Sequence, residues 1–353
     1  MTTRPIKLGL ALLGQGPVSE MIDQARRAES IGFEVILLPD HLGFTAPLVP
    51  LVAIAQPAVQ VSNLVLNAAF YRPALLARDL ASVDSATGGR LIVSLGTGYV
   101  EDEFVAAGLP FPSPGERVKW LTNHVAEIRR LLSDPGHIPP PVQTPPPIMV
   151  GGGGDKLLTM AAHQADIIAI ASTGTEADLA ERVAFVKAQA GERSDDIELS
   201  FGFFQVSMDD PSDLSILRMV APDASESEMR QWTTLLDGTV DEAAQRIHRL
   251  HNDLGISYFT VNATPGIAAT SLCPFDRSAT LRDGPLFSHR FATIGRRCIP
   301  MQFMAVLNTQ LLTECIGITF QLRLLLRGHP FSTIHMLFHL PQQIVIVIVT
   351  IGL

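Results

Sequence analysis

Apolar residues in this chain alternate between short continuous runs and longer stretches in which they recur at helical spacing. Ile6–Leu13 is a continuous run closed by a glycine, which is typical of a strand buried on both faces in a parallel sheet. In the stretch that follows, Met21, Ala25 and Ala28 recur at helical spacing, and Gly32 ends the predicted helix. The sequence therefore opens with a strand followed by a helix.

The same alternation repeats as far as residue 263. Further strands are predicted at Glu34–Pro39, Leu64–Phe70, Leu91–Leu95, Ile148–Val150, Ile167–Ala171, Leu199–Val206 and Tyr258–Val261. The helices between them are predicted at Leu48–Val59, Pro73–Ser85, Arg117–Leu132, Lys156–Gln164, Glu176–Ala190 and Val240–Leu254. Asp134–Pro147 holds seven prolines and is predicted to be irregular. About eight strand–helix units in a row favour an α/β fold of the (β/α)8 TIM-barrel type over a doubly wound open sheet, so we assign residues 1–263 to a barrel.

The pattern stops near Asn262, where an eighth helix should follow to cover the last strand. Residues 264–353 contain apolar runs, no lysine and all three cysteines of the chain. Within them, Gln343–Leu353 is β-branched and nearly uncharged, which is typical of an aggregation-prone strand. We interpret residues 264–353 as an atypical apolar extension, either frame-shifted or poorly ordered. Either part of Phe291–Leu326 replaces the missing helix or the barrel is left incomplete.

Composition excludes several classes of protein. The net charge of -9 argues against a nucleic-acid partner. The apolar run near the N-terminus is too short for a signal peptide or a membrane span, so we expect a cytoplasmic protein without a membrane partner. Residues 1–263 contain no cysteine, and the histidines show no convincing metal spacing, so no metal site is predicted.

Polar residues follow the second and third predicted strands, at the end of such a barrel where active sites lie. Asp40 and His41 come directly after the second strand. A histidine there can contact a ring cofactor or move a proton near neutral pH, and Asp40 is a candidate to hold its tautomer. Asn67 lies in the third strand, where its amide can pair with a ring carbonyl and N–H. The alternatives are a helix cap, a loop histidine and an asparagine that closes a strand.

Glycines follow the fourth and fifth predicted strands. In the fourth, Thr97 and Gly98 offer a hydroxyl and a backbone that a ligand can approach closely. The acids Glu101–Glu103 come next and suit the start of a helix. In the fifth, Gly151–Gly154 leads into a helix that carries Lys156, an arrangement that binds phosphate through free N–H groups. The alternative for this glycine run is a bare tight turn.

Taken in order, these segments resemble the luciferase-like monooxygenase superfamily, and most closely its branch that uses coenzyme F420, a deazaflavin. The resemblance covers roughly residues 5 to 263. It is carried by Glu34–His41, Tyr71–Arg78, Gly88–Gly98, Pro147–Gly154, Ala165–Asp166 and Gly238–Glu242.

The resemblance implies a ring bound at the carboxyl-terminal mouth of the barrel and a phosphate near the glycine run. It places His41 as the catalytic residue. The implied cofactor contacts are Asp40, His41, Asn67, Thr97, Gly98, Asp102, Gly153, Gly154, Lys156 and Leu157. The family often has a non-proline cis peptide in the third strand, here near Leu64–Val65 or Asn67–Ala68. Tyr99 occupies the position of a glutamate in the sugar-phosphate dehydrogenase relatives, which speaks against a sugar-phosphate substrate.

The leading functional hypothesis is an oxidoreductase that transfers a hydride between coenzyme F420 and a small organic substrate. One alternative is an FMN-dependent monooxygenase that uses O2 and reduced flavin from a separate flavin reductase. A second alternative is a non-catalytic flavin-binding barrel. A homodimer is a further hypothesis. The loops around Gly98–Pro114 and Met208–Trp232 carry no recognisable substrate code.

Overall fold

The computed structural model describes residues 4–55, 58–172, 174–208 and 210–263, together with the backbone of three later strands. The chain divides into two compact units, Met1–Thr280 and Leu281–Leu353. In the second unit β12 (Ala305–Leu307), β14 (Ile344–Thr350) and β13 (Thr333–His339) form an antiparallel sheet in that order. The expectations for an eighth helix and for residues 264–304 lie outside the described residues.

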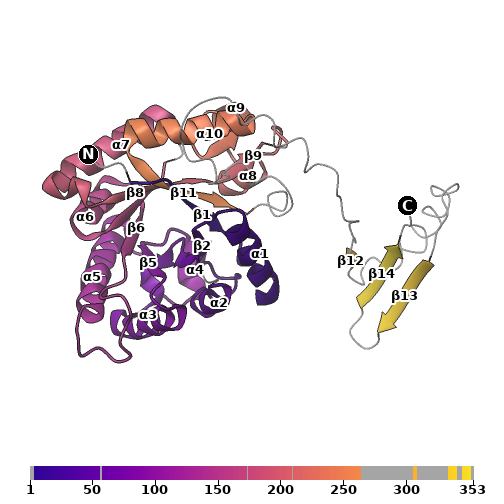
Figure 1. Ribbon diagram of the computed structural model, residues 1–353, viewed down its shortest axis with the longest axis horizontal. Coiled ribbons are helices and arrows are strands. Elements are labelled where there is room, and N and C mark those ends of the chain that lie inside the picture. Colours follow the sequence, from indigo (N-terminus) through magenta and orange to yellow (C-terminus); the bar gives the residue numbers. More distant parts are fainter. Residues whose placement is uncertain are drawn as a thin grey trace. The chain divides into compact units, whose positions relative to one another are not determined.

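The first unit is a closed parallel barrel (Figure 1). The strands of its sheet are β1 (Lys7–Ala11), β2 (Val35–Leu38), β3 (Gln60–Asn63), β4 (Leu66–Asn67), β5 (Leu91–Gly96), β6 (Ile148–Gly152), β7 (Ile167–Ile170), β8 (Glu198–Phe203) and β11 (Ile256–Asn262). Their order is β3-β2-β1-β11-β8-β7-β6-β5-β4, and a further pairing of β3 with β5 closes the ring. Because β4 continues β3 along the same neighbour, these strands fill eight barrel positions, which confirms the predicted fold.

Helices follow the strands and cover the outside of the barrel (Figure 1). They are α1 (Val18–Ser30), α2 (Leu48–Ile54), α3 (Pro73–Thr87), α5 (Pro114–Leu132), α6 (Asp155–Gln164), α7 (Glu176–Ala190) and α10 (Val240–Arg249), which ends in a π-helical turn, Leu250–Leu254. A short 3-10 helix, Gly191–Asp195, follows α7. Among the residues that the structure describes, none of the helices has both the length and the apolar character that a bilayer span requires.

Two apolar clusters follow from the alternation of side chains along each strand. In β2, Val35 and Leu37 belong to a small cluster that fills the barrel interior, whereas Ile36 and Leu38 belong to the large cluster between strands and helices. All four are buried on both faces of the sheet, which is why the strand reads as one continuous apolar run.

The third strand begins four residues earlier than the sequence predicts. β3 starts at Gln60, and Ala68–Phe70 is a 3-10 helix rather than the end of a strand. The polar side chains of Gln60 and Ser62 hide β3 from an apolar-run criterion. Ser62 is nevertheless buried, because its hydroxyl donates to the carbonyl of Ile92 at 3.0 Å.

The peptide bond between Leu64 and Val65 is cis, at the first of the two predicted positions. It lies where the chain passes from β3 to β4. The side chain of Val65 lies against Gly96 at the end of β5 and against Gly151 in β6. Side chains larger than glycine at these two positions would therefore crowd Val65.

A salt bridge lies over an aromatic ring at the amino-terminal end of the barrel. Nζ of Lys7 lies 2.6 Å from the carboxylate of Glu198 and 4.5 Å from the centre of the Tyr258 ring. Tyr258 is fully buried, and its burial raises the pKa of its hydroxyl well above the ordinary value. In barrels of this type the active site lies at the opposite end, the carboxyl-terminal mouth.

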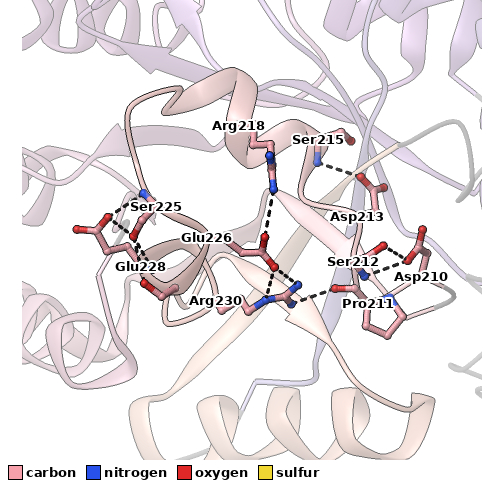
Figure 2. A network of polar contacts seen from close by, with 11 residues as sticks. Asp210, Pro211, Ser212, Asp213, Ser215, Arg218, Ser225, Glu226, Glu228 and Arg230 are labelled. Carbon is pink, nitrogen blue, oxygen red and sulfur yellow. Dashed lines mark hydrogen bonds and ion pairs between the residues drawn. The ribbon is translucent and has the colours of Figure 1, made fainter.

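An insertion follows β8 at that mouth. β9 (Gln205–Ser207) and β10 (Leu235–Asp237) form a separate parallel pair, and α8 (Ser215–Val220) and α9 (Glu226–Met229) lie between them. Glu226 joins the two short helices, since its carboxylate pairs with Arg218 at 3.3 Å and with Arg230 at 2.7 Å (Figure 2). The sequence pattern did not predict α8 and α9.

The proline-rich segment 134–147 contains no helix or strand, as predicted. Its far end is held by Asp84 of α3, which is fully buried. The Asp84 carboxylate accepts hydrogen bonds from the backbone N–H groups of Val142 and Gln143 at 2.7 and 2.8 Å, and from Nε2 of Gln143 at 2.7 Å. These bonds satisfy two backbone N–H groups of the segment and hold the chain against α3 before it enters β6.

Candidate active site

Asp40 and His41 follow β2 at the mouth, as the sequence predicts. Asp40 is 9% exposed, and its Oδ2 accepts hydrogen bonds from the backbone N–H of Asn67 at 2.9 Å and from the hydroxyl of Tyr71 at 3.1 Å. Burial raises the pKa of Asp40 above its ordinary value, while these two hydrogen bonds and the neighbouring His41 act in the opposite direction. Asp40 therefore ties the end of β2 to the turn after β4.

His41 is paired with Glu103 rather than with Asp40. Its Nδ1 lies 2.7 Å from Oε1 of Glu103, and the two side chains are 29% and 15% exposed. The rings of Phe44 and Tyr99 meet the imidazole edge-on at 5.7 and 5.8 Å between centroids. The expectation that Asp40 holds the tautomer of His41 is therefore wrong, because the Asp40 carboxylate is turned toward Asn67 and Tyr71.

Asn67 presents an unused donor at the mouth. The residue is 4% exposed, and its Oδ1 accepts from the backbone N–H of Ala69 at 3.1 Å. Its Nδ2 is buried and has no hydrogen-bond partner. Gly98, at φ 66°, packs directly against this amide, so any side chain at position 98 would collide with it. A buried amide without a partner is costly, and a ligand acceptor at this place would satisfy it.

The glycine run forms the start of α6. Gly153 lies so close to the carbonyl oxygen of Ala171 that no Cβ fits there, whereas a Cβ on Gly154 would meet nothing within 4 Å. Gly154 is the N-cap and supplies no side-chain cap. The starts of α1, α2 and α3 also lack a side-chain cap, whereas α5, α7, α9 and α10 each begin with a complete capping box. The first N–H groups of α6 therefore have no side-chain cap, and the space beside Gly154 where a Cβ would lie is open, which suits an anion.

The remaining predicted contacts vary in how they can act. Lys156 is exposed, and its Nζ lies near Gly115 at the start of α5. Leu157 is buried under the glycine turn, so that only its backbone can face a ligand. Thr97 is half-buried at the end of β5. Asp102 is exposed in the first turn of α4 (Glu101–Ala106), and the structure gives it no hydrogen bond to the other candidates.

Comparison with known families agrees with this geometry. The family model described as luciferase-like monooxygenase matches residues 3–251. The chain belongs to the luciferase-like monooxygenase family. As in other barrels, its predicted site residues gather at the carboxyl ends of the strands. Among the described residues of this luciferase-like protein, no group of three or more histidine, cysteine or acidic side chains could hold a metal ion.

Curated relatives of this luciferase-like protein include F420-dependent glucose-6-phosphate dehydrogenases. The protein of Amycolatopsis mediterranei is 30% identical over 123 residues, which cover 32% of this chain and 37% of the relative. That of Kineococcus radiotolerans is 32% identical over 143 residues, covering 37% and 42%. The matched segment thus spans well under half the length of these relatives.

Solved structures show the same fold at low sequence identity. An F420-dependent secondary alcohol dehydrogenase in complex with an F420-acetone adduct has a TM-score of 0.63 at 18% identity, covering 77% of this chain and all 100% of that one. The F420-dependent tetrahydromethanopterin reductase of Methanopyrus kandleri has a TM-score of 0.60 at 17% identity, covering 75% and 96%. The long-chain alkane monooxygenase LadA has a TM-score of 0.63 at 14% identity, covering 76% and 89%.

Two residues of the site were missed by sequence reasoning. Glu103 was treated with Glu101 and Asp102 as one acidic helix start, but only Glu103 turns inward to His41. A signal was present, since the buried Phe104 fixes which side of the short helix faces the barrel. Tyr71 was noted only as part of a motif, and its hydroxyl reaches Asp40.

Proposed function

We propose that this protein is an oxidoreductase that transfers a hydride between coenzyme F420 and a small organic substrate. The observation that carries the proposal is the buried, unpartnered Nδ2 of Asn67, which lies beside Gly98 at the mouth together with the His41–Glu103 pair. The matched segments of F420-dependent dehydrogenases support the choice of cofactor.

The residues present fit a ring with a phosphate-bearing tail. Nδ2 of Asn67 would donate to an acceptor on the ring, and Gly98 leaves the space that the amide needs. Gly153 and Gly154 with the uncapped start of α6 would receive the phosphate, and Lys156 would add a positive charge beside it. When bound, the deazaflavin ring supplies the atom that takes up or releases the hydride.

His41 would then handle the proton. Oxidation of an alcohol carbon releases a hydride from carbon and a proton from oxygen, and reduction of the carbonyl needs both back. His41 stands at the mouth beside the Phe44 and Tyr99 rings, where an imidazole can accept or return that proton near neutral pH. Asp40 is buried and accepts hydrogen bonds from Asn67 and Tyr71, so it would hold the surrounding backbone in place.

Tyr99 bears on the choice of substrate. It is 74% exposed at the rim, directly after Gly98, and the side chain that it presents is aromatic and uncharged at neutral pH. An uncharged aromatic side chain at this position favours a neutral, partly apolar substrate over the glucose 6-phosphate named for the relatives.

FMN is the second candidate cofactor. The glycine cradle at α6 would accept its phosphate equally well, and monooxygenases such as LadA share the fold. In that case a reduced flavin would come from a reductase, and the substrate would be oxygenated with O2. The homodimer and the reductase partner remain predictions.

The experiment titrates the purified protein with F420 and, separately, with FMN. The fluorescence of the cofactor ring measures the binding of each. We expect F420 to bind at least tenfold more tightly than FMN. Reduced F420 on the protein should be reoxidised when a carbonyl substrate is added. Tighter binding of FMN, with consumption of O2, would establish the monooxygenase. Binding without turnover of either reduced cofactor would identify a non-catalytic flavin-binding barrel.

A further inference from the structure

The contact between His41 and Glu103 brings together segments that are 62 residues apart. His41 follows β2, while Glu103 is carried by the short helix α4 after β5. Phe104, the residue after Glu103, is fully buried and packs edge-on against Phe111 at 5.0 Å between ring centroids. This anchor fixes α4 and so turns Glu103 toward the imidazole.

No other described group competes for Nδ1 of His41. The ionisable groups that face the imidazole are Glu103, Asp40 and Tyr99. Asp40 uses its Oδ2 for Asn67 and Tyr71, and Tyr99 meets the imidazole through its ring edge. Nε2 of His41 is hydrogen bonded to no residue that the structure describes.

We propose that Glu103 is the positioning residue of His41: it holds the hydrogen on Nδ1 and so presents Nε2 to the substrate. A carboxylate can only accept a hydrogen bond, so an Nδ1 at 2.7 Å from it must donate. In the neutral imidazole the other nitrogen then carries the lone pair. Nε2 is therefore the atom that takes a proton from a hydroxyl substrate.

The same carboxylate balances the charge when His41 is protonated. As the alcohol is oxidised, its O–H proton would move to Nε2, and the deazaflavin, when bound, would supply the acceptor for the hydride from the carbon that bears this oxygen. The resulting imidazolium has Glu103 as its counter-charge at 2.7 Å, and the pair is mostly shielded from water. In the reverse direction Nε2 returns the proton to the carbonyl oxygen. This role rests on the proposed function, but the tautomer itself does not.

The tautomer is measured on the full-length protein without cofactor, and turnover on the same protein with F420 added. Imidazole ¹⁵N shifts report which ring nitrogen carries hydrogen, and the His41→Asn variant assigns the signal. The test variants are Glu103→Ala and Glu103→Met, of which the second keeps most of the side-chain volume without an oxygen. Glu103→Gln retains an acceptor, and Glu101→Ala removes an exposed acid from the same helical turn as a matched control.

We expect the Nδ1–H tautomer in the wild type, in Glu103→Gln and in Glu101→Ala, and its loss in Glu103→Ala and Glu103→Met. Turnover should fall about tenfold or more in the last two, with KM changed much less, and recover in part with glutamine. An unchanged Nδ1–H signal in a folded Glu103→Met variant overturns the proposal. If the tautomer changes but turnover does not, the positioning role holds and the catalytic role of His41 fails.

Discussion

Gly153 lies against the carbonyl oxygen of Ala171, so closely that no Cβ could be added without moving one of the two. Its neighbour Gly154 faces open space at the start of α6. Two adjacent glycines thus have different requirements, one set by the packing of the barrel and the other left for a ligand. This difference separates a binding defect from a folding defect.

Gly154→Val should weaken cofactor binding at least tenfold, about 1.4 kcal/mol, because a side chain there would occupy the place of the phosphate. The backbone at Gly154 has φ -78° and ψ 145°, a conformation that valine adopts without strain. Fluorescence titration measures the affinity, and the melting temperature should stay close to that of the wild type. Gly153→Val, in contrast, should lower the melting temperature. Wild-type affinity in Gly154→Val would remove the phosphate from this position.

His41→Ala should lower kcat by about 10²–10⁴-fold, the usual range for a general acid–base group, while affecting thermal stability little. Steady-state kinetics and a thermal melt together measure the two effects. His163→Ala is the matched control, because this histidine is exposed on α6, away from the described contacts of the site. A variant that keeps its activity but melts earlier would show that His41 is structural.

Asp40 should make stability depend on pH in a defined direction. Burial raises the pKa of Asp40 above its ordinary value of 3.8, so just above pH 3.8 the folded protein retains a proton that the unfolded chain has lost. The folded state binds more protons in this interval, and the contribution of Asp40 to the unfolding free energy therefore falls as pH rises through it. Asp40→Asn should remove that fall, which urea unfolding from pH 4 to pH 7 measures. Parallel curves for the two proteins would contradict the effect.

Asp84→Asn should destabilise the barrel by about 2 kcal/mol or more, because asparagine has only one acceptor oxygen, and its NH2 would face either the two backbone N–H groups or Nε2 of Gln143 at a fully buried position. Denaturant unfolding measures the loss. Asp79→Asn lies on the same helix and removes only a side chain that pairs with its neighbour Arg78 near the surface, so we expect a change within about 0.5 kcal/mol. Equal effects of the two substitutions would show that Asp84 does not anchor the proline-rich segment.

Deletion of Gly328–Leu353 should raise the soluble yield and leave cofactor binding intact. The deletion removes β13 and β14, including the nearly uncharged, β-branched strand Ile344–Thr350. Yield after centrifugation and the titration described above measure the two outcomes. A truncated protein that no longer melts cooperatively would place these residues in the core of the fold.

The apolar runs predicted the barrel well where strands are buried on both faces. β2 and β5 are examples, since every residue of each is buried and reads as continuous. The search for apolar runs missed β3 because Ser62 is polar. Its hydroxyl donates to the carbonyl of Ile92 inside the barrel, and the sequence pattern does not show that partner. The helix α5 was also predicted from the sequence. The Ser113–Glu116 capping box starts it three residues before the predicted position.

The sequence located residues of the candidate site but did not predict which of them pair with one another. Asp40, His41 and Asn67 stand at strand ends, which sequence order locates, and the structure brings them to one mouth. Which carboxylate meets His41 depends on the direction of side chains from two separate loops. Asp40 was expected to pair with His41 because the two are adjacent in the chain. The packing of Phe104 instead turns Glu103 toward the imidazole.

The insertion after β8 carries its own means of cohesion. The contacts of Glu226 with Arg218 and Arg230, and that of Arg230 with the carbonyl of Pro211, join insertion residues to one another (Figure 2). Leu214, Leu217 and Met229 form a separate small apolar cluster with Leu235 of β10. A unit that holds itself together can diverge while the barrel beneath it stays the same. Substitutions among these insertion residues are therefore expected to leave the strands of the barrel and the residues at its mouth in place.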